Sequence, residues 1–268
     1  MTAIALEPAP TGRIGPSQAL GNGMTLAWRN VMQLKHSPEK LMDVTLMPIV
    51  FLLMFLYVFG GVVAGSTHSY LQQLLPGLVA QMGMFASMGL GTSLCEDIHK
   101  GVFDRFRSLP IARSAPLIGA VVGDSVRFFV TMVMLVAFGS LLGFRFHEGP
   151  VSVLAAFGLA YVFYFAVCWV SALVGLVAST PATVQGLAFI WTMPLTFGSS
   201  VLLADTQTMP GWLQAWVKVN PVTHLADSVR ALTVGGPIGN HAYYTLAWAA
   251  GIVLVSFPVA VWMYGRKV

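Results

Sequence analysis

The sequence predicts an all-α integral membrane protein with six transmembrane helices, and three observations support this fold class. Hydrophobic residues make up 56% of the 268 positions, and the mean hydropathy is +0.76. Only 9% of the residues are charged, whereas soluble domains typically carry about 25%, so a soluble globular fold is excluded. Residues 44–95 and 149–204 contain no Asp, Glu, Lys or Arg, and each stretch is long enough for two spans of about 20 residues.

The N-terminal part is predicted to stay outside the hydrocarbon. Residues 1–22 are rich in Pro and Gly and lack a signal-peptide apolar stretch, so we expect a flexible cytoplasmic tail. The segment 24–41 predicts an interfacial helix on the membrane surface, because its apolar residues share one helical face. A short surface helix packed on the protein itself fits the same pattern. The apolar residues are Met24, Ala27, Trp28, Val31 and Leu34.

Six apolar stretches are assigned as spans, and the breaks between them have turn or polar character. The stretch 60–69 is rich in Gly, Ser and His, and a short polar turn of Ser179, Thr180 and Pro181 divides the second uncharged run. A long polar and aromatic insert, 205–241, precedes the last span. The predicted spans are about 44–64, 73–95, 116–142, 151–178, 182–204 and 243–264.

Basic residues are distributed unequally between the two sides of this arrangement. Cytoplasmic loops carry an excess of Lys and Arg, so the richer side, with both termini, is predicted to be cytoplasmic. The same asymmetry accounts for the net charge of +4, and nucleic acid is not an expected partner. The inner bases are Arg13, Arg29, Lys35, Lys40, Lys100, Arg105, Arg107, Arg113, Arg266 and Lys267, against Arg145, Lys218 and Arg230 outside.

The connector 96–114 holds a dense cluster of charge between two apolar runs. Such a cluster cannot lie in hydrocarbon, where each unpaired charge costs several kcal/mol. Residues 98–108 can form a short helix with an apolar patch that includes Phe103 and Phe106, and Pro110 would stop it. A helix of this kind suits docking into a groove on a cytosolic partner, although a solvated loop fits the composition equally well.

The insert before the last span contains a second pattern, which predicts a capped helix. Asn220 is suited to cap a helix and Pro221 to open it. Asp227 and Arg230 lie three residues apart on that helix and can form an ion pair. Trp212 has the amphipathic ring that favours a membrane–water interface.

Asp124 and Arg127 are spaced i, i+3 near the inner end of the third predicted span. Ionisable residues inside a membrane are functional candidates by default. A structural ion pair near the headgroups, with Arg127 extended toward them, fits the spacing as well. If Asp124 instead carried protons, the chain would be a proton-coupled secondary transporter.

Several motifs that carry chemistry do not occur in the sequence. It contains no G-x-x-x-x-G-K-[ST] phosphate loop, so we expect no ATP site on this chain. Neither an H-E-x-x-H nor a G-x-S-x-G motif occurs, and Cys95 with His99 lacks further ligands at convincing spacing. We therefore expect no catalytic residue, no metal and no cofactor on this chain, and we interpret Cys95 and Cys168 as packing residues.

Two blocks carry a family resemblance. The run E-D-I-H-K-G-V-F-D-R-F-R-S-L-P-I-A-R-S, residues 96–114, resembles the cytoplasmic loop of ABC-type-2 exporter permeases, especially those of the daunorubicin-resistance type. The run W-L-Q-A-W-V-K-V-N-P-V-T-H-L-A-D-S-V-R-A-L, residues 212–232, resembles the family's Asn-Pro helix before the last span. Both blocks occur in the family's order within a six-span layout.

The resemblance implies six helices per permease, a permease dimer and cytosolic ATPase subunits that bind ATP and Mg. The interfacial helix and the helix of the connector would contact the ATPase, and the Asn-Pro segment would form re-entrant helices on the outer side. The implied coupling residues are Glu96, Asp97, Gly101, Phe103, Asp104, Arg105, Phe106, Arg107, Leu109 and Pro110. The outer motif comprises Trp212, Asn220, Pro221 and Arg230.

The expected function is that of a permease subunit of an ATP-binding-cassette exporter in the plasma membrane of a prokaryote. Its substrate would be a hydrophobic drug, an antibiotic or a lipid-like molecule. The expected partners are a cytosolic ABC ATPase, a second permease copy in a homodimer, and membrane lipids. The alternative remains the secondary transporter centred on Asp124.

Overall fold

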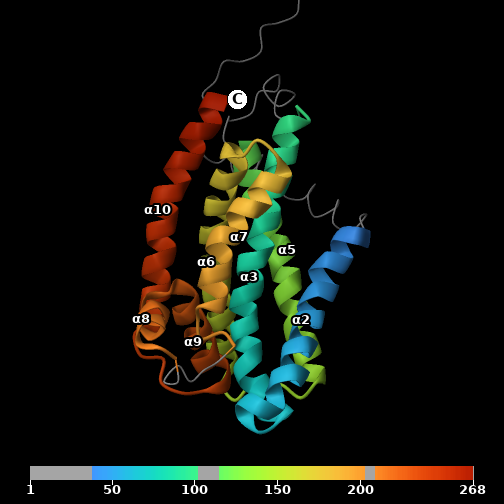
Figure 1. Ribbon diagram of the computed structural model, residues 1–268, viewed down its shortest axis with the longest axis vertical. Helices are drawn as coiled ribbons and strands as arrows, with labels where there is room; N and C mark the ends of the chain where they lie inside the picture. Colours follow the sequence, from blue (N-terminus) through green and yellow to red (C-terminus); the bar gives the residue numbers. More distant parts are fainter. Residues whose placement is uncertain (1–37, 102–114, 203–208, 268) are drawn as a thin grey trace, which may run out of the picture.

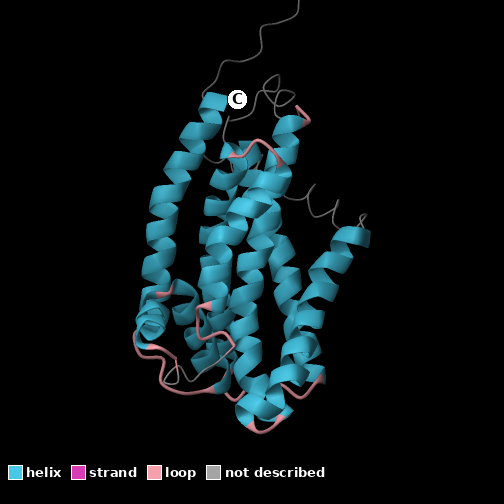
Figure 2. Ribbon diagram, in the orientation of Figure 1, coloured by secondary structure: helices cyan, strands magenta, loops and turns pink. Residues whose placement is uncertain are grey.

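The computed structural model describes residues 38–101, 115–202 and 209–267. Over these ranges the chain consists of helices joined by turns, without a strand among the described residues (Figure 2). The predicted all-α class is therefore confirmed for this part of the chain. The helices are α2 (Pro38–Ala64), α3 (Thr67–His99), α5 (Ala115–Leu141), α6 (Pro150–Val177), α7 (Pro181–Phe197), α8 (Gly211–Val219), α9 (Pro221–Val234) and α10 (His241–Lys267).

Helix α3 forms the centre of the bundle (Figure 1). It packs against α2, α5, α6, α7 and α9. In its apolar stretch 83% of the residues are buried, compared with 17–44% in the four other long apolar helices. A helix that is apolar on all sides is typical of a buried core position, so any displacement of α3 acts on most of the bundle.

The bundle has two ends that carry different elements (Figure 1). At one end, which we call the loop end, α3 finishes at His99, α5 begins at Ala115, and α10 finishes at Lys267. The turn from α6 to α7 also lies there. At the opposite end, which we call the α9 end, α2 turns into α3 and the short helices α8 and α9 pack together.

Five helices among the described residues are long and apolar enough to cross a membrane, namely α2, α3, α5, α6 and α10. The predicted span 182–204 corresponds to α7, which has 17 residues and ends at Phe197. Pro194 lies in the last turn of α7, and residues 198–202 follow without helical structure. The predicted arrangement of six spans therefore stays a prediction.

Two helix starts differ from the predicted boundaries. Helix α2 begins at Pro38, so the last residues of the predicted interfacial segment 24–41 belong to α2. A proline suits this first turn, where its missing N–H has no partner to lose. The rest of that segment and the tail 1–22 lie outside the described residues. Helix α3 begins before the predicted start at residue 73, because the Ser66 side chain caps it by accepting a hydrogen bond from Ser69 N at 3.1 Å.

Candidate functional site

The charged connector is described as far as Gly101. Glu96 and Asp97 lie in the last turns of α3, and the Glu96 carboxylate pairs with Lys100 Nζ at 3.0 Å. The hydrogen bond to Glu96 raises the pKa of Lys100. Both side chains are exposed, so the pair adds little to stability. The coupling residues Phe103, Asp104, Arg105, Phe106, Arg107, Leu109 and Pro110 lie outside the described residues.

Gly101 ends α3 and turns the chain out of the helix. Its φ angle is +64°, in the left-handed region, and its backbone N–H donates to the Ile98 carbonyl oxygen at 3.1 Å. Glycine adopts this conformation without the steric penalty of a Cβ atom, which makes it the common residue after a helix end. The glycine of the sequence block therefore fixes where the connector departs from α3.

The last turn of α3 is held against the turn between α6 and α7. The Cys95 thiol lies 3.7 Å from the Ala178 carbonyl oxygen, and His99 Nδ1 lies 2.8 Å from the Cys95 carbonyl oxygen. Cys95 and Cys168 are both buried and free of disulfide bonds. No group of three His, Cys, Asp or Glu side chains among the described residues could hold a metal ion. The end of α3 thus contacts the turn between α6 and α7 through the Cys95 thiol.

Asn220 joins the end of α7 to the start of α9. Its Oδ1 accepts a hydrogen bond from Val222 N at 2.9 Å, which confirms the predicted cap on the helix opened by Pro221. Its Nδ2 donates to the carbonyl oxygens of Leu195 at 2.8 Å and Gly198 at 2.7 Å. The last carbonyls of a helix have no partner within it, so Asn220 satisfies groups that α7 leaves open.

Arg230 fastens α9 to α3 and to the segment after α7. Its Nη1 lies 2.6 Å from Asp227 Oδ1, which confirms the predicted ion pair. Its Nε donates to the Gln73 carbonyl oxygen at 3.2 Å, and its Nη2 donates to the Ser200 carbonyl oxygen at 3.0 Å. The Ser200 hydroxyl also donates to Asp227 Oδ1 at 2.8 Å. The Arg230 side chain is 15% exposed, and each of its three nitrogens donates to an acceptor, which offsets the cost of burying the charge.

A cavity of about 200 Å³ opens beside this ion pair at the α9 end. His224 Nδ1 and His241 Nδ1, both in its lining, lie 3.1 Å apart, and His241 Nδ1 lies 3.8 Å from Asp227 Oδ2. Burial, and then the neighbouring His241, lower the pKa of His224. One neutral ring can donate its N–H to the other, which links α9 to the start of α10. The cavity is lined by Ser200, Val217, Lys218, Thr223, His224, Asp227 and His241.

Two tryptophans of α8 lie at the surface of the α9 end. Trp212 is 74% exposed and Trp216 is 44% exposed. The Trp216 indole Nε1 donates to the Pro194 carbonyl oxygen at 3.4 Å, so α8 also contacts the end of α7. Exposed rings of this kind suit a membrane–water interface, which is the position predicted for Trp212.

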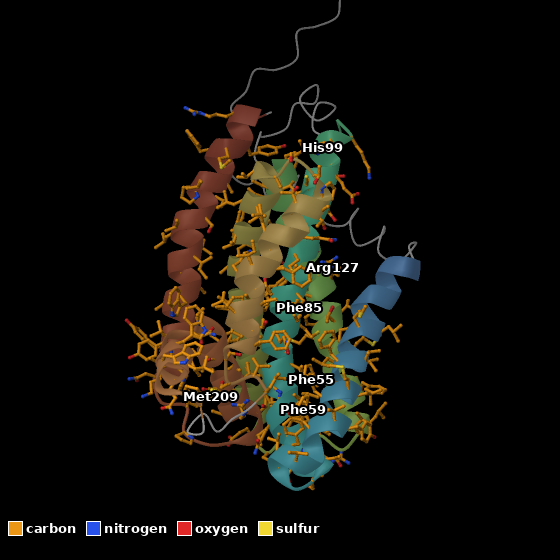
Figure 3. All side chains as sticks on the ribbon, in the orientation of Figure 1. Phe55, Phe59, Phe85, His99, Arg127 and Met209 are labelled. Carbon is orange, nitrogen blue, oxygen red and sulfur yellow. The ribbon has the colours of Figure 1, made fainter. Side chains whose placement is uncertain are left out.

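Asp124 and Arg127 form a partly buried ion pair, with side chains 10% and 24% exposed. Asp124 Oδ1 lies 3.0 Å from Arg127 Nε. The two residues are the tenth and thirteenth of the 27-residue α5, so the pair lies near the middle of that helix and not near its inner end. Figure 3 shows Arg127 at about the level of Phe85. The Tyr164 hydroxyl of α6 donates to Asp124 Oδ2, so both carboxylate oxygens have partners.

Arg127 also contacts α3. Its Nη2 donates to the Ala86 carbonyl oxygen at 2.6 Å. A Cβ atom at Gly89 would overlap Arg127 Nη2, so this glycine leaves the space that the guanidinium occupies. Arg127 therefore lies against α3 at Ala86 and Gly89. Together with Tyr164, the pair connects α3, α5 and α6.

Sequence reasoning missed the partners that other helices supply. Tyr164 lies 40 residues from Asp124, and His224 and His241 lie 17 residues apart. A polar ring inside an uncharged run was a signal that could have singled out Tyr164. Gly89 carried a weaker signal, because a glycine inside a spanning helix often marks a close approach.

Comparison with known proteins connects these features to one family. The family model described as ABC-2 type transporter matches residues 22–234. The daunorubicin resistance ABC transporter permease protein DrrB1 of Streptomyces coeruleorubidus is 43% identical over 254 residues, covering 94% of this chain and 89% of that protein. The doxorubicin resistance ABC transporter permease protein DrrB of Mycobacterium tuberculosis is 29% identical over 193 residues, covering 69% and 66% of the two chains. The matched region includes the charged connector, the Asp124–Arg127 pair and α9, and the chain belongs to the ABC-2 type transporter family.

Proposed function

We propose that this chain is the transmembrane permease subunit of an ATP-driven exporter of hydrophobic, drug-like molecules. A separate cytosolic ATPase subunit would bind ATP with Mg and dock on the connector 96–114. Two permease copies would form the transport path within the plasma membrane. The names of the two relatives, which refer to resistance against daunorubicin and doxorubicin, support the substrate class.

The observation that carries this proposal is the connection between the connector and the central helix. The connector begins where α3 ends, at His99, and α3 packs against five other helices. A force applied to the connector therefore acts directly on the core of the bundle. Glu96 and Lys100 remain exposed at this point, which leaves their charge accessible to a cytosolic partner.

The proposed topology has the loop end and both termini on the cytoplasmic side. Helix α7 would then provide the sixth crossing together with residues 198–202. A helix of 17 residues is about 25 Å long, slightly less than the roughly 30 Å of hydrocarbon. Ser199, Ser200 and Val201 are buried in protein, which is where irregular backbone is tolerated at membrane depth.

Proton-coupled transport through Asp124 has less support in the geometry. A proton carrier must release and rebind its proton during each cycle. Arg127 and Tyr164 engage both oxygens of the Asp124 carboxylate. These contacts favour a structural role for Asp124 and leave the charged connector as the better candidate for energy input.

The first experiment is purification of the tagged chain in mild detergent, followed by reconstitution with the ATPase that co-purifies. We expect ATP-dependent accumulation of daunorubicin inside inverted vesicles. Phe106→Ala or Arg105→Ala should reduce both ATPase association and transport by about ten-fold, because each removes an anchor from the proposed docking helix.

Arg145→Ala serves as the matched control, since it removes an exposed positive charge from the opposite end. It should leave association and transport unchanged. Transport that proceeds without any ATPase and stops in Asp124→Asn would overturn the proposal in favour of the proton-coupled alternative.

A further inference from the structure

We propose that Arg127 is a positioning residue that makes α3 and α5 move as one unit when the connector 96–114 is displaced. This inference rests on the proposed function. The connector joins the two helices at the loop end, and Arg127 joins them again inside the bundle (Figure 3).

The Arg127 contact lies at nearly the same distance from the loop end on both helices. Ala86 precedes His99, the last residue of α3, by 13 positions, and Arg127 follows Ala115, the first residue of α5, by 12. At 1.5 Å per residue, both partners lie about 18–20 Å from the loop end. Because the contact ties α3 to α5 at this depth, a displacement that starts at the loop end of either helix is shared by both helices inside the bundle.

The surface of α3 is shaped to receive this cross-link. Gly89 leaves the space for the guanidinium, as a Cβ atom there would overlap Arg127 Nη2. Gly83 has a similar role earlier in the same helix, where a Cβ atom would meet the Phe128 ring at 3.2 Å and the Tyr164 ring at 3.6 Å. The Phe128 and Tyr164 rings are stacked with centroids 4.1 Å apart.

The chemistry of arginine is what allows one side chain to serve two helices. Nε pairs with Asp124 on its own helix, while Nη2 donates to the Ala86 carbonyl on α3. The Tyr164 hydroxyl then connects Asp124 to α6. A lysine would still neutralise Asp124, but its single ammonium group lacks the planar fork that reaches both partners. A pair that existed only to neutralise charge would therefore tolerate lysine, and a cross-link would not.

The contact itself is tested first on the full chain in detergent. Arg127→Lys and Gly89→Ala should each lower the midpoint of thermal unfolding, and the double variant should be no less stable than the worse single variant. Such non-additivity is expected when two substitutions break one interaction. Gly158→Ala is the control, because a Cβ atom at this glycine of α6 meets nothing within 4 Å. It makes the same helix substitution without touching Arg127, and its effect should add to that of Arg127→Lys.

The positioning role is tested in the reconstituted complex with daunorubicin as the probe. Arg127→Lys and Gly89→Ala should lower the number of molecules transported per ATP hydrolysed by about five-fold, a change typical of residues that couple distant sites. ATPase association and hydrolysis should stay near the unmodified level, and Gly158→Ala should leave the ratio unchanged.

Each outcome decides between the alternatives. Additive unfolding effects of Gly89→Ala and Arg127→Lys would overturn the cross-link. Non-additive effects with an unchanged transport-to-ATP ratio would overturn the positioning role and leave a structural contact. If Arg127→Lys lowers the number of molecules transported per ATP hydrolysed but Gly89→Ala does not, the effect belongs to the placement of the charge. This result would also overturn the proposal. Absence of ATP-dependent transport by the unmodified complex would instead refute the proposed function, since the unfolding test does not depend on transport.

Discussion

The loop end and the α9 end each carry an ion pair between neighbouring turns, and the two pairs are held in different ways. Arg230 and Asp227 have side chains 15% and 26% exposed, and Arg230 also donates to carbonyls of Gln73 and Ser200. Lys100 and Glu96 have side chains 66% and 47% exposed, and they pair with each other at the surface. The α9 end therefore maintains its own shape, whereas the loop end presents charge that a partner can contact.

Removing the cation from both ion pairs tests this difference most strongly. Arg230→Met leaves Asp227 in a mostly buried position without its cation, so we expect a loss of about 3 kcal/mol in the free energy of unfolding. Lys100→Met should produce no measurable change, because its pair is exposed to solvent. Denaturant or thermal unfolding of the purified chain measures both. Equal effects of the two substitutions would contradict the distinction between the ends.

A second prediction concerns the link between α7 and α9. Asn220→Ala removes the cap of α9 and two donors to the carbonyls of Leu195 and Gly198, so we expect a loss of about 2 kcal/mol. Arg145→Ala is the control, since this residue is exposed at the same end of the bundle. The same unfolding measurement applies, and a comparable loss for Arg145→Ala would show that the α9 end is sensitive to any change.

The smallest expected effect is on the pH dependence of the α9 end. Burial lowers the pKa of His224, so the folded state favours its neutral ring. The contribution of this ring is complete above the ordinary histidine pKa of about 6.5 and is lost as the pH falls through the lower folded pKa. Protonation places a positive charge on the His224 ring, which burial disfavours and whose Nδ1 lies 3.1 Å from His241 Nδ1.

Thermal unfolding midpoints recorded between about pH 7.5 and 5, a range that brackets the ordinary histidine pKa of about 6.5, test this prediction. His224→Gln should flatten the decline on the acid side, because it removes the group whose protonation is disfavoured. His147→Gln, at an exposed position of the same end, should keep the unmodified slope. An identical slope in both variants would rule out the histidine pair as the source of the acid sensitivity.

Hydropathy predicted the long helices well because lipid demands uncharged stretches of a minimum length. It could not predict the end of α7. Residues 198–202 continue the uncharged run, yet Val201 is buried in protein rather than in lipid. An apolar residue satisfies either environment, so the sequence alone does not distinguish a longer span from a segment folded back into the bundle.

The candidate sites were predictable where their chemistry is local. Asn220 with Pro221, and Asp227 with Arg230, are recognisable because a cap and an i, i+3 pair need only neighbouring residues. The Ala86 carbonyl that receives Arg127 carries no signal, since every residue has the same backbone oxygen. Tertiary contacts of this kind depend on how α3 and α5 pack, which the composition of neither helix determines.

The double role of Asn220 has a consequence for the biosynthesis of this protein. The carbonyls of Leu195 and Gly198 precede their partner by 25 and 22 residues, so the partner is made after the helix end that it satisfies. Hydrocarbon offers backbone carbonyls no hydrogen-bond donor of its own. The end of α7 therefore gains these two partners only once the chain has been made as far as the start of α9.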